Sequence, residues 1–277
     1  MATKGKKQSS SEGWLDAEPE ARGLLPFVGI AVTLGIWYAV TYFSTGVLAN
    51  FAPAEAFNAL TGCRINTMSC AEQGLLNNPE FYSQHIRASM TRFGGALALS
   101  LVVGLPLGVL VGYFDTAERL SSVSFQFLRM ISPVAWFPVA LLVFESGGHA
   151  APIFIMFMGG VWPLVFNTAH GINTIDENWL KVADSLGGTT RSKIRKVVIP
   201  GVVPDMLSGL RLSIGWLWIL LVPAEYLGVN SGMGYFILNA RQQFSYAEIP
   251  AVMIVIGIIG FTLDLGVRKL QARWSWQ

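Results

Sequence analysis

Apolar residues of this 277-residue chain gather in six stretches separated by shorter polar segments. A helix needs roughly 20 consecutive apolar residues to cross the hydrocarbon core of a bilayer, and it satisfies its own backbone hydrogen bonds there. The pattern therefore predicts an all-α polytopic membrane protein with six transmembrane helices. The expected spans are residues 23–43, 85–113, 122–144, 151–169, 206–228 and 249–270.

The composition agrees with this pattern, since 52% of the residues are hydrophobic, 13% are charged and the mean hydropathy is +0.49. These values lie outside the range of soluble globular domains. A net charge of +2 gives no electrostatic footprint for nucleic acid. Residues 1–22 are mostly polar, so we expect a tail without a fold of its own, followed by one transmembrane domain over residues 23–277.

The basic residues predict the orientation of the helices. Six crossings leave both termini on one side, and the loops of the opposite side hold little beyond Arg64 and Arg241. The positive-inside rule makes the termini and residues 170–205 cytoplasmic, whereas residues 44–84 form an external cap of short helices and turns. The basic residues on the cytoplasmic side are Lys4, Lys6, Lys7, Arg22, Arg119, Lys181, Arg191, Lys193, Arg195, Lys196, Arg268, Lys269 and Arg273.

The chemistry-bearing residues favour no enzyme. Cys63 and Cys70 are separated by six intervening residues in the external segment, a spacing that fits a small disulfide loop as well as two unpaired thiols. No cysteine or histidine has the spacing of a metal site, and no nucleophile is accompanied by a base. A G-x-x-x-x-G-K-[ST] loop for nucleoside triphosphates is also missing. We therefore expect a chain without its own metal or cofactor, which takes energy from another subunit.

The polar segment of residues 170–205 has a pattern of its own. Gly187 and Gly188 interrupt a predicted helix, Thr189 offers a capping hydroxyl, and a second, basic helix leads to Pro200. A solvated loop that only sets the topology is the simpler alternative. An apolar stripe outside the membrane instead favours a docking surface for a partner. The stripe consists of Ile175, Trp179, Val182, Ala183 and Leu186.

The same segment resembles a known motif. Residues 182–188, V-A-D-S-L-G-G, followed by V-V-I-P at residues 197–200, are similar to the E-A-A-x-x-x-G segment and downstream I-x-L-P of permeases from ATP-binding-cassette importers. Lys181 departs from the pattern, because the family commonly has Glu there. The residues that this resemblance assigns to ATPase coupling are Lys181, Val182, Ala183, Asp184, Ser185, Leu186, Gly187, Gly188 and Pro200.

Other matches follow in order along the chain. Residues 128–138, L-R-M-I-S-P-V-A-W-F-P, resemble the L-R-P-x-x-P-x-A-W-x-P element of the nitrate, sulfonate and taurine branch. Residues 224–225 and 230–235 are similar to the A-E and S-G-L-G-Y elements of that branch. The long external segment before the second span is similar to that of cyanobacterial nitrate, nitrite or bicarbonate permeases.

This resemblance implies the type I importer permease fold, in the bacterial inner membrane. Two copies would form one path, two cytoplasmic ATPases would bind ATP and Mg, and a periplasmic or membrane-anchored binding protein would deliver the substrate. The resemblance favours nitrate or nitrite, with bicarbonate and sulfonate or taurine as alternatives. A secondary transporter driven by an ion gradient is the rival from another class, although no inverted repeat is evident.

Arg129, Arg211, Glu225 and Asp264 are the clearest ionisable residues within the spans, where each costs roughly 2 to 3 kcal/mol or more unless it has a partner or faces water. Depth in the membrane predicts that Asp264 pairs with Arg129 or Arg211 and that Glu225 does not. The arginine left free offers a small anion a bidentate site, and Arg129 is our hypothesis. The alternative is a purely structural ion pair. The expected path residues are Arg129, Trp136, Asn167, Arg211 and Glu225.

Overall fold

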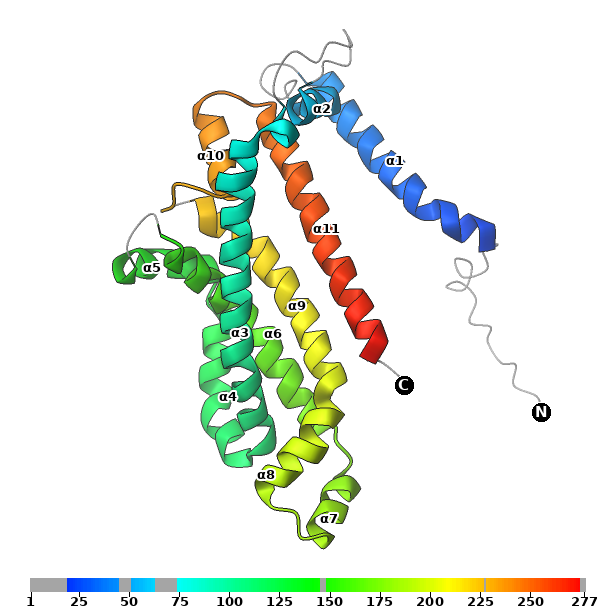
Figure 1. Cartoon of the computed structure of the whole chain (residues 1–277), viewed down its shortest axis with the longest axis vertical. Coiled ribbons are helices and arrows are strands. Elements are labelled where there is room, and N and C mark those ends of the chain that lie inside the picture. The colour runs from blue at the N-terminus through cyan, green and yellow to red at the C-terminus, as the bar shows by residue number, and fades with distance from the viewer. Residues whose placement is uncertain (1–18, 45–50, 63–73, 145–147, 227, 275–277) are drawn as a thin grey trace, which may run out of the picture.

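The computed structural model describes residues 19–44, 51–62, 74–144, 148–226 and 228–274. Every regular element within them is helical, as the apolar pattern predicts (Figure 1). The α-helices are α1 Pro19–Phe43, α2 Pro53–Thr61, α3 Arg87–Tyr113, α4 Asp115–Met130, α5 Phe137–Val143, α6 Ala150–Asn173, α7 Glu177–Ser185, α8 Thr190–Lys193, α9 Ile199–Tyr226, α10 Met233–Gln242 and α11 Glu248–Trp274. Short 3₁₀ turns at Leu75–Asn77 and Pro133–Trp136 and wider π turns at Phe81–Ile86 and Ile194–Val198 complete them.

The number of membrane crossings is four or five in the described part of the chain. The helices that contain α3, α6, α9 and α11 are long and apolar enough to cross, and the bent pair α4 and α5 makes a fifth if it counts as one span. Helix α1 has 25 residues and stands apart from the bundle (Figure 1). It contacts α2. The predicted count of six is therefore not confirmed.

The centre of the bundle is α6, which packs between α3 and α9. Glycines of α3 one turn apart allow this close approach, because a Cβ at Gly104 would lie 3.0 Å from Leu164 Cβ, and one at Gly108 would lie 2.6 Å from Thr168 Cβ. Small residues let helix backbones approach in this way within membranes. The glycine pattern of the second span thus serves packing rather than transport chemistry.

The predicted span of residues 122–144 is not one straight helix. Helix α4 ends at Met130, and the chain turns by 88° into the segment Pro133–Val143. A proline disfavours helical backbone in the residue before it, and Ser132 accordingly has ψ 129°. Pro133 therefore turns a predicted crossing into a broken one.

The two ends of the bundle carry different elements (Figure 1). Helices α2 and α10 lie at one end, while α7 and α8 lie at the opposite end. We expected a short basic helix that stops at Pro200, but residues 190–226 form one continuous helix of 37 residues. A wide π turn at Ile194–Val198 comes just before Pro200, and such turns absorb the carbonyl that a proline frees. The second helix of the polar segment is therefore the start of a long helix that includes α9.

Candidate functional site

A glycine turn ends α7 at the tip of the polar segment. Gly187 has φ +72°, a left-handed conformation that glycine adopts without strain. The Gly188 amide donates to the Ala183 carbonyl over 2.9 Å, which is the long bond of a Schellman motif. Thr189 then caps the next helix, because its hydroxyl accepts from the Ser192 amide. The two glycines thus fix the direction in which α7 points.

The apolar stripe of this segment is divided between the body and the surface. Ile175 packs against Ile172, Val198 and Val202 and so anchors the segment to the bundle. Val182 and Leu186, by contrast, are 59% and 82% exposed, and Trp179 is exposed with them. These three lie at helical spacing on one face of α7, which we call the α7 stripe. An apolar surface of this kind outside the membrane-length helices favours a protein partner.

The other residues predicted for coupling lie around the α7 stripe. Lys181 and Ser185 are exposed, and the Ser185 hydroxyl donates to the Lys181 carbonyl within the helix. Ala183 and Gly188 are half-buried in the turn. Pro200 lies apart from them, exposed in the first turn of α9. The side chain of Asp184 falls outside the described residues.

Arg129 lies in a pocket of about 480 Å³ between α4, α6 and α9. Its guanidinium carbon is 4.8 Å from the centre of the Phe166 ring, which is cation–π distance. Among the described residues no acceptor bonds to this guanidinium, so its N–H groups are available to a ligand. We call this cavity the Arg129 pocket. Its lining is Arg129, Met130, Pro133, Met158, Gly159, Trp162, Pro163, Phe166, Asn167, Leu212 and Trp216.

Helix α4 presents three distinct sides. Phe125 faces the body and meets the Trp162 ring, with centroids 5.5 Å apart. A polar side formed by exposed residues one turn apart ends at Arg129; it consists of Glu118, Ser122, Gln126 and Arg129. An apolar side of exposed residues lies next to it and consists of Leu120, Val123, Phe127 and Met130. A helix with adjacent exposed polar and apolar sides fits a boundary between water and lipid.

The other predicted path residues are only partly brought together. Asn167 lines the Arg129 pocket, but its side-chain amide donates to the Pro163 carbonyl over 2.8 Å. Trp136 does not line that pocket and instead meets the Phe154 ring edge-on. Arg211 lies on α9 and donates from Nε to Asp264 Oδ1 over 3.2 Å. The predicted pairing of Asp264 with one of the two arginines is therefore confirmed, with Arg211 as the partner.

Glu225 lies elsewhere, in a buried cluster between α3 and α9. Its carboxylate is 0% exposed and accepts from Arg92 Nη1 over 2.8 Å, while Arg92 itself is 1% exposed. Glu225 lines neither the Arg129 pocket nor the groove beside Arg211. In this conformation Glu225 is a buried ion-pair partner, and its place in the path stays a prediction. The prediction that neither Arg129 nor Arg211 pairs with Glu225 agrees with this geometry.

The same cluster holds the loop between α9 and α10. Arg92 also donates to the Ser231 carbonyl and hydroxyl, over 2.6 and 2.9 Å. Glu225 accepts from the Gly234 amide over 3.1 Å, and Gly232 has φ +112° with no room for a Cβ against that carboxylate. This explains physically why the N-S-G-M-G-Y run contains glycines. We call Arg92, Glu225 and Ser231 the Arg92 cluster.

Sequence reasoning missed Arg92, although a signal was present. Arg92 falls near the outer end of the second predicted span, and Glu225 falls near the outer end of the fifth. The depth argument that paired Asp264 with Arg129 or Arg211 therefore also predicts that Arg92 pairs with Glu225.

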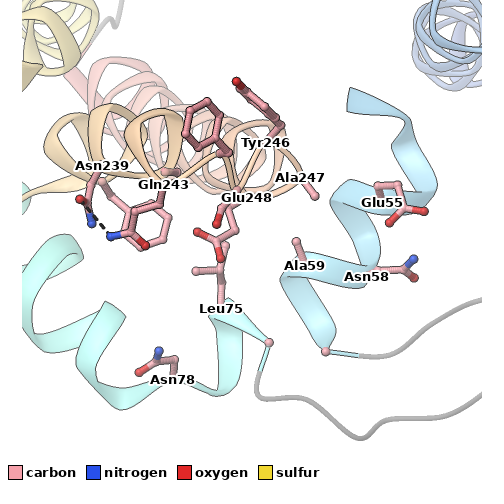
Figure 2. Close-up of a pocket in the computed structure, with 16 residues that line it drawn as sticks. Glu55, Asn58, Ala59, Leu75, Asn78, Asn239, Gln243, Tyr246, Ala247 and Glu248 are labelled. Carbon is pink, nitrogen blue, oxygen red and sulfur yellow. Dashed lines mark hydrogen bonds between the residues drawn. The ribbon is translucent and has the colours of Figure 1, made fainter. Parts of the chain in front are cut away.

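A second cavity, of about 620 Å³, lies at the end of the bundle that carries α2 and α10. Figure 2 shows Glu248 near its centre, with Glu55 and Asn58 on α2, Asn239 on α10 and Gln243 just after α10 around it. Its described lining contains two carboxylates and several amides but no basic residue. Cys63 and Cys70, with their possible disulfide, fall outside the described residues.

Comparisons with known proteins agree with this geometry. Residues 104–273 match the family described as binding-protein-dependent transport system inner membrane component. The chain is 35% identical to the bicarbonate transport system permease protein CmpB of Synechococcus elongatus, over 91% of this chain and 88% of that one. It is 30% identical to the nitrate import permease protein NrtB of Leptolyngbya laminosa, over 96% and 92% of the two chains.

A solved structure supports the fold. The methionine ABC transporter MetNI in an inward-facing conformation matches with a TM-score of 0.58 at 16% identity, over 69% of this chain and 94% of that one. The likeness at this identity concerns the fold alone. Together with the family match, it places an all-helical, multi-pass chain among the permeases of ABC importers. This protein therefore belongs to the inner-membrane components of binding-protein-dependent transport systems, as the permease subunit of an ABC importer.

Proposed function

We propose that this chain forms half of a path that imports a small planar inorganic oxyanion: nitrate, nitrite or bicarbonate. The sequence favoured nitrate, but relatives named for bicarbonate and for nitrate match over similar shares of the chain. Nitrate is therefore not singled out. The observation that carries the proposal is the Arg129 pocket, in which a guanidinium without a protein acceptor lies over an aromatic ring.

The chemistry of the pocket favours an inorganic oxyanion over taurine. A planar oxyanion can accept two parallel N–H bonds from a guanidinium, and such bidentate pairs are strong. Taurine carries an ammonium as well as a sulfonate, and a desolvated ammonium requires an acceptor of its own. The described lining of the pocket contains Arg129 and no carboxylate. Taurine is thus the weaker candidate for this site.

The polar side of α4 supports a water-filled continuation of this path. Glu118, Ser122 and Gln126 extend from Arg129 along the helix for three turns. Polar residues at membrane depth usually face the bundle interior or water. We infer that this side lines the path and that the apolar side at Val123 and Phe127 faces lipid or a second copy of the chain.

In this proposal the energy for import enters at the end of the bundle that carries α7 and α8. The α7 stripe is exposed and apolar, and the chain has no phosphate-binding loop of its own. We infer that two ATP-binding subunits dock on this stripe, one for each of two permease copies, and bind the ATP and Mg. The docking side is cytoplasmic in this proposal, as the basic residues predict for both termini. A binding protein would deliver the anion at the end with α2 and α10.

Uptake by the reconstituted importer tests the substrate class. The permease is placed in liposomes with its ATPases and binding protein, and ATP-dependent uptake of labelled nitrate, bicarbonate and taurine is compared. We expect uptake of nitrate or bicarbonate and little of taurine. Uptake of taurine alone would contradict the oxyanion proposal, and uptake without any ATPase would contradict the importer mechanism itself.

Cysteine labelling tests the path independently of transport. In a chain whose Cys63 and Cys70 are replaced by Ser, single cysteines are introduced at positions 122 and 126 and, as matched controls, at 123 and 127. A charged, membrane-impermeant thiol reagent should modify the first pair from the cytoplasmic side and leave the controls unmodified. Equal labelling of both pairs would remove the polar side of α4 from the path.

A further inference from the structure

A groove of about 620 Å³ between α9 and α11 has no place in the proposed anion path. The Gln271 amide on α11 donates to the Ser208 hydroxyl on α9 and ties the two helices together at one end of the groove. The lining consists of Ser208, Arg211, Leu212, Gly215, Trp216, Ile219, Asp264 and Gln271. Of these residues, Leu212 and Trp216 also line the Arg129 pocket, so they form a wall between the two cavities.

One end of this groove is positively charged. Asp264, which lines the groove, accepts from Arg211 Nε at 3.2 Å, and Arg268, one turn further along α11 and just outside that lining, contacts the same carboxylate through Nε at 2.6 Å. Two guanidinium groups against one carboxylate leave one net positive charge. The carboxylate of Asp264 contacts only the Nε of each arginine. Within the described chain the remaining N–H groups of Arg211 and Arg268 have no acceptor. Both side chains are partly exposed, at 39% and 56%, so these donors are open to a ligand.

The other end of the groove is apolar. Leu212, Trp216 and Ile219 on α9 are exposed, and Ile219 lies about two turns from Arg211, away from the α7 end of the molecule. Because α9 begins next to α8 and continues toward α10, the Arg211 end of the groove lies nearer α7 and α8 than the Ile219 end does. A ligand that fits both ends has an anionic head and a hydrocarbon tail parallel to the helices.

We propose that this groove binds an anionic phospholipid, with the phosphate on Arg211 and Arg268 and an acyl chain along Trp216 and Ile219. Basic pockets between transmembrane helices, placed at the level of the lipid headgroups, suit phosphate groups. A free small anion lacks the tail for the apolar end. The transported anion is also a poor candidate, since Asp264 already neutralises one of the two arginines. This assignment does not depend on which anion the importer carries.

Native mass spectrometry of the assembled importer tests the proposal. The complex is purified with its ATPases from membranes that contain phosphatidylglycerol and phosphatidylcholine, and retained lipid is counted. We expect phosphatidylglycerol to be retained over phosphatidylcholine. Loss of one basic contact in Arg268→Gln should lower this retention by about fivefold. Arg268→Lys, which keeps the charge, should retain most of the lipid and shows that the complex tolerates a change at this position.

Lys269→Gln is the matched control, because it removes the same charge one residue along α11 from a side chain that forms no ion pair with Asp264 within the described residues. It should retain phosphatidylglycerol like the unmodified chain. Equal retention in Arg268→Gln and Lys269→Gln would overturn the proposal. Displacement of the bound species by millimolar inorganic phosphate would assign the charged end to a soluble anion instead, and would also overturn it.

Discussion

Arg92 and Arg129 lie in two regions of the bundle that accommodate a positive charge in opposite ways. Arg92 is buried between α3 and α9, and Glu225 and Ser231 accept three of its hydrogen bonds. Arg129 lies at the end of α4 against the Phe166 ring, with its guanidinium open to the Arg129 pocket. The charge of Arg92 is paired within the protein, whereas the charge of Arg129 is available to a ligand.

This difference shows how a charge within a membrane domain can be assigned to structure or to transport. An ionised arginine within a membrane span requires a partner or contact with water. For Arg92 the compensation is internal and complete enough to fix a loop that contains Ser231. For Arg129 the ring of Phe166 compensates only in part, and in the proposed path water or the transported anion would supply the rest. The two regions should therefore respond differently to the same substitution.

Arg92→Ala should produce the largest effect. Removing one partner of a buried ion pair leaves Glu225 uncompensated, which typically costs about 3–5 kcal/mol. We expect the assembled importer to lose most of its thermal stability, as followed by size-exclusion of the heated complex in detergent. The double variant Arg92→Met with Glu225→Leu should recover much of it, because no lone charge remains. An Arg92→Ala importer of normal stability without uptake would move the Arg92 cluster into the path.

Arg129→Ala should abolish uptake and leave assembly intact. A hydrogen bond to a charged group contributes about 1.5–3 kcal/mol, so uptake should fall about 10- to 100-fold while the thermal stability of the complex is unchanged. Arg119→Ala is the matched control, since Arg119 is exposed on the same helix and lies outside the pocket. Unchanged uptake kinetics in Arg129→Ala would remove this residue from the anion path.

Gly187→Ala should weaken coupling by a smaller factor. The left-handed conformation at φ +72° costs a residue with a side chain about 1–2 kcal/mol, although a Cβ here meets no neighbour. We expect substrate-stimulated ATPase activity to fall about 5- to 30-fold through misdirection of α7. Asparagine tolerates this conformation better, so Gly187→Asn should retain more activity. Equal activity in all three chains would show that the ATPases do not read the direction of the α7 stripe.

The sequence allowed these contrasts to be predicted where the relevant information is local. Helical positions and the glycine turn at Gly187 follow from spacing along the chain. Depth in the membrane predicts that Asp264 pairs with Arg129 or Arg211, and the folded structure selects Arg211. The Arg92 cluster does not follow from spacing, because it joins residues 133 positions apart and buries them by packing. Depth in the membrane does indicate this pair, because Arg92 and Glu225 both fall near the outer ends of their predicted spans.

The bend at Pro133 shows a second limit of prediction from the sequence. An apolar pattern reports which residues avoid water, and it is the same for a straight helix and for two helices joined at 88°. The prolines were visible in the sequence, but whether a proline bends a span depends on what packs around it. Pro163 and Pro223 lie inside α6 and α9, which continue through them. The shape of the Arg129 pocket depends on this bend, so it could not be predicted from the apolar pattern alone.

Asn167→Ala should have the smallest effect and sharpens the contrast between the two arginines. Asn167 lines the Arg129 pocket, but its amide donor is bonded to the Pro163 carbonyl of its own helix and its free oxygen would repel an anion. We expect uptake within about twofold of the unmodified importer, as for substitutions that remove no essential contact. Concentration-dependent uptake measures this, with Arg129→Ala as the comparison. A loss as large as that of Arg129→Ala would mean that the amide leaves Pro163 to bind the anion, so the pocket would contribute two ligands rather than one.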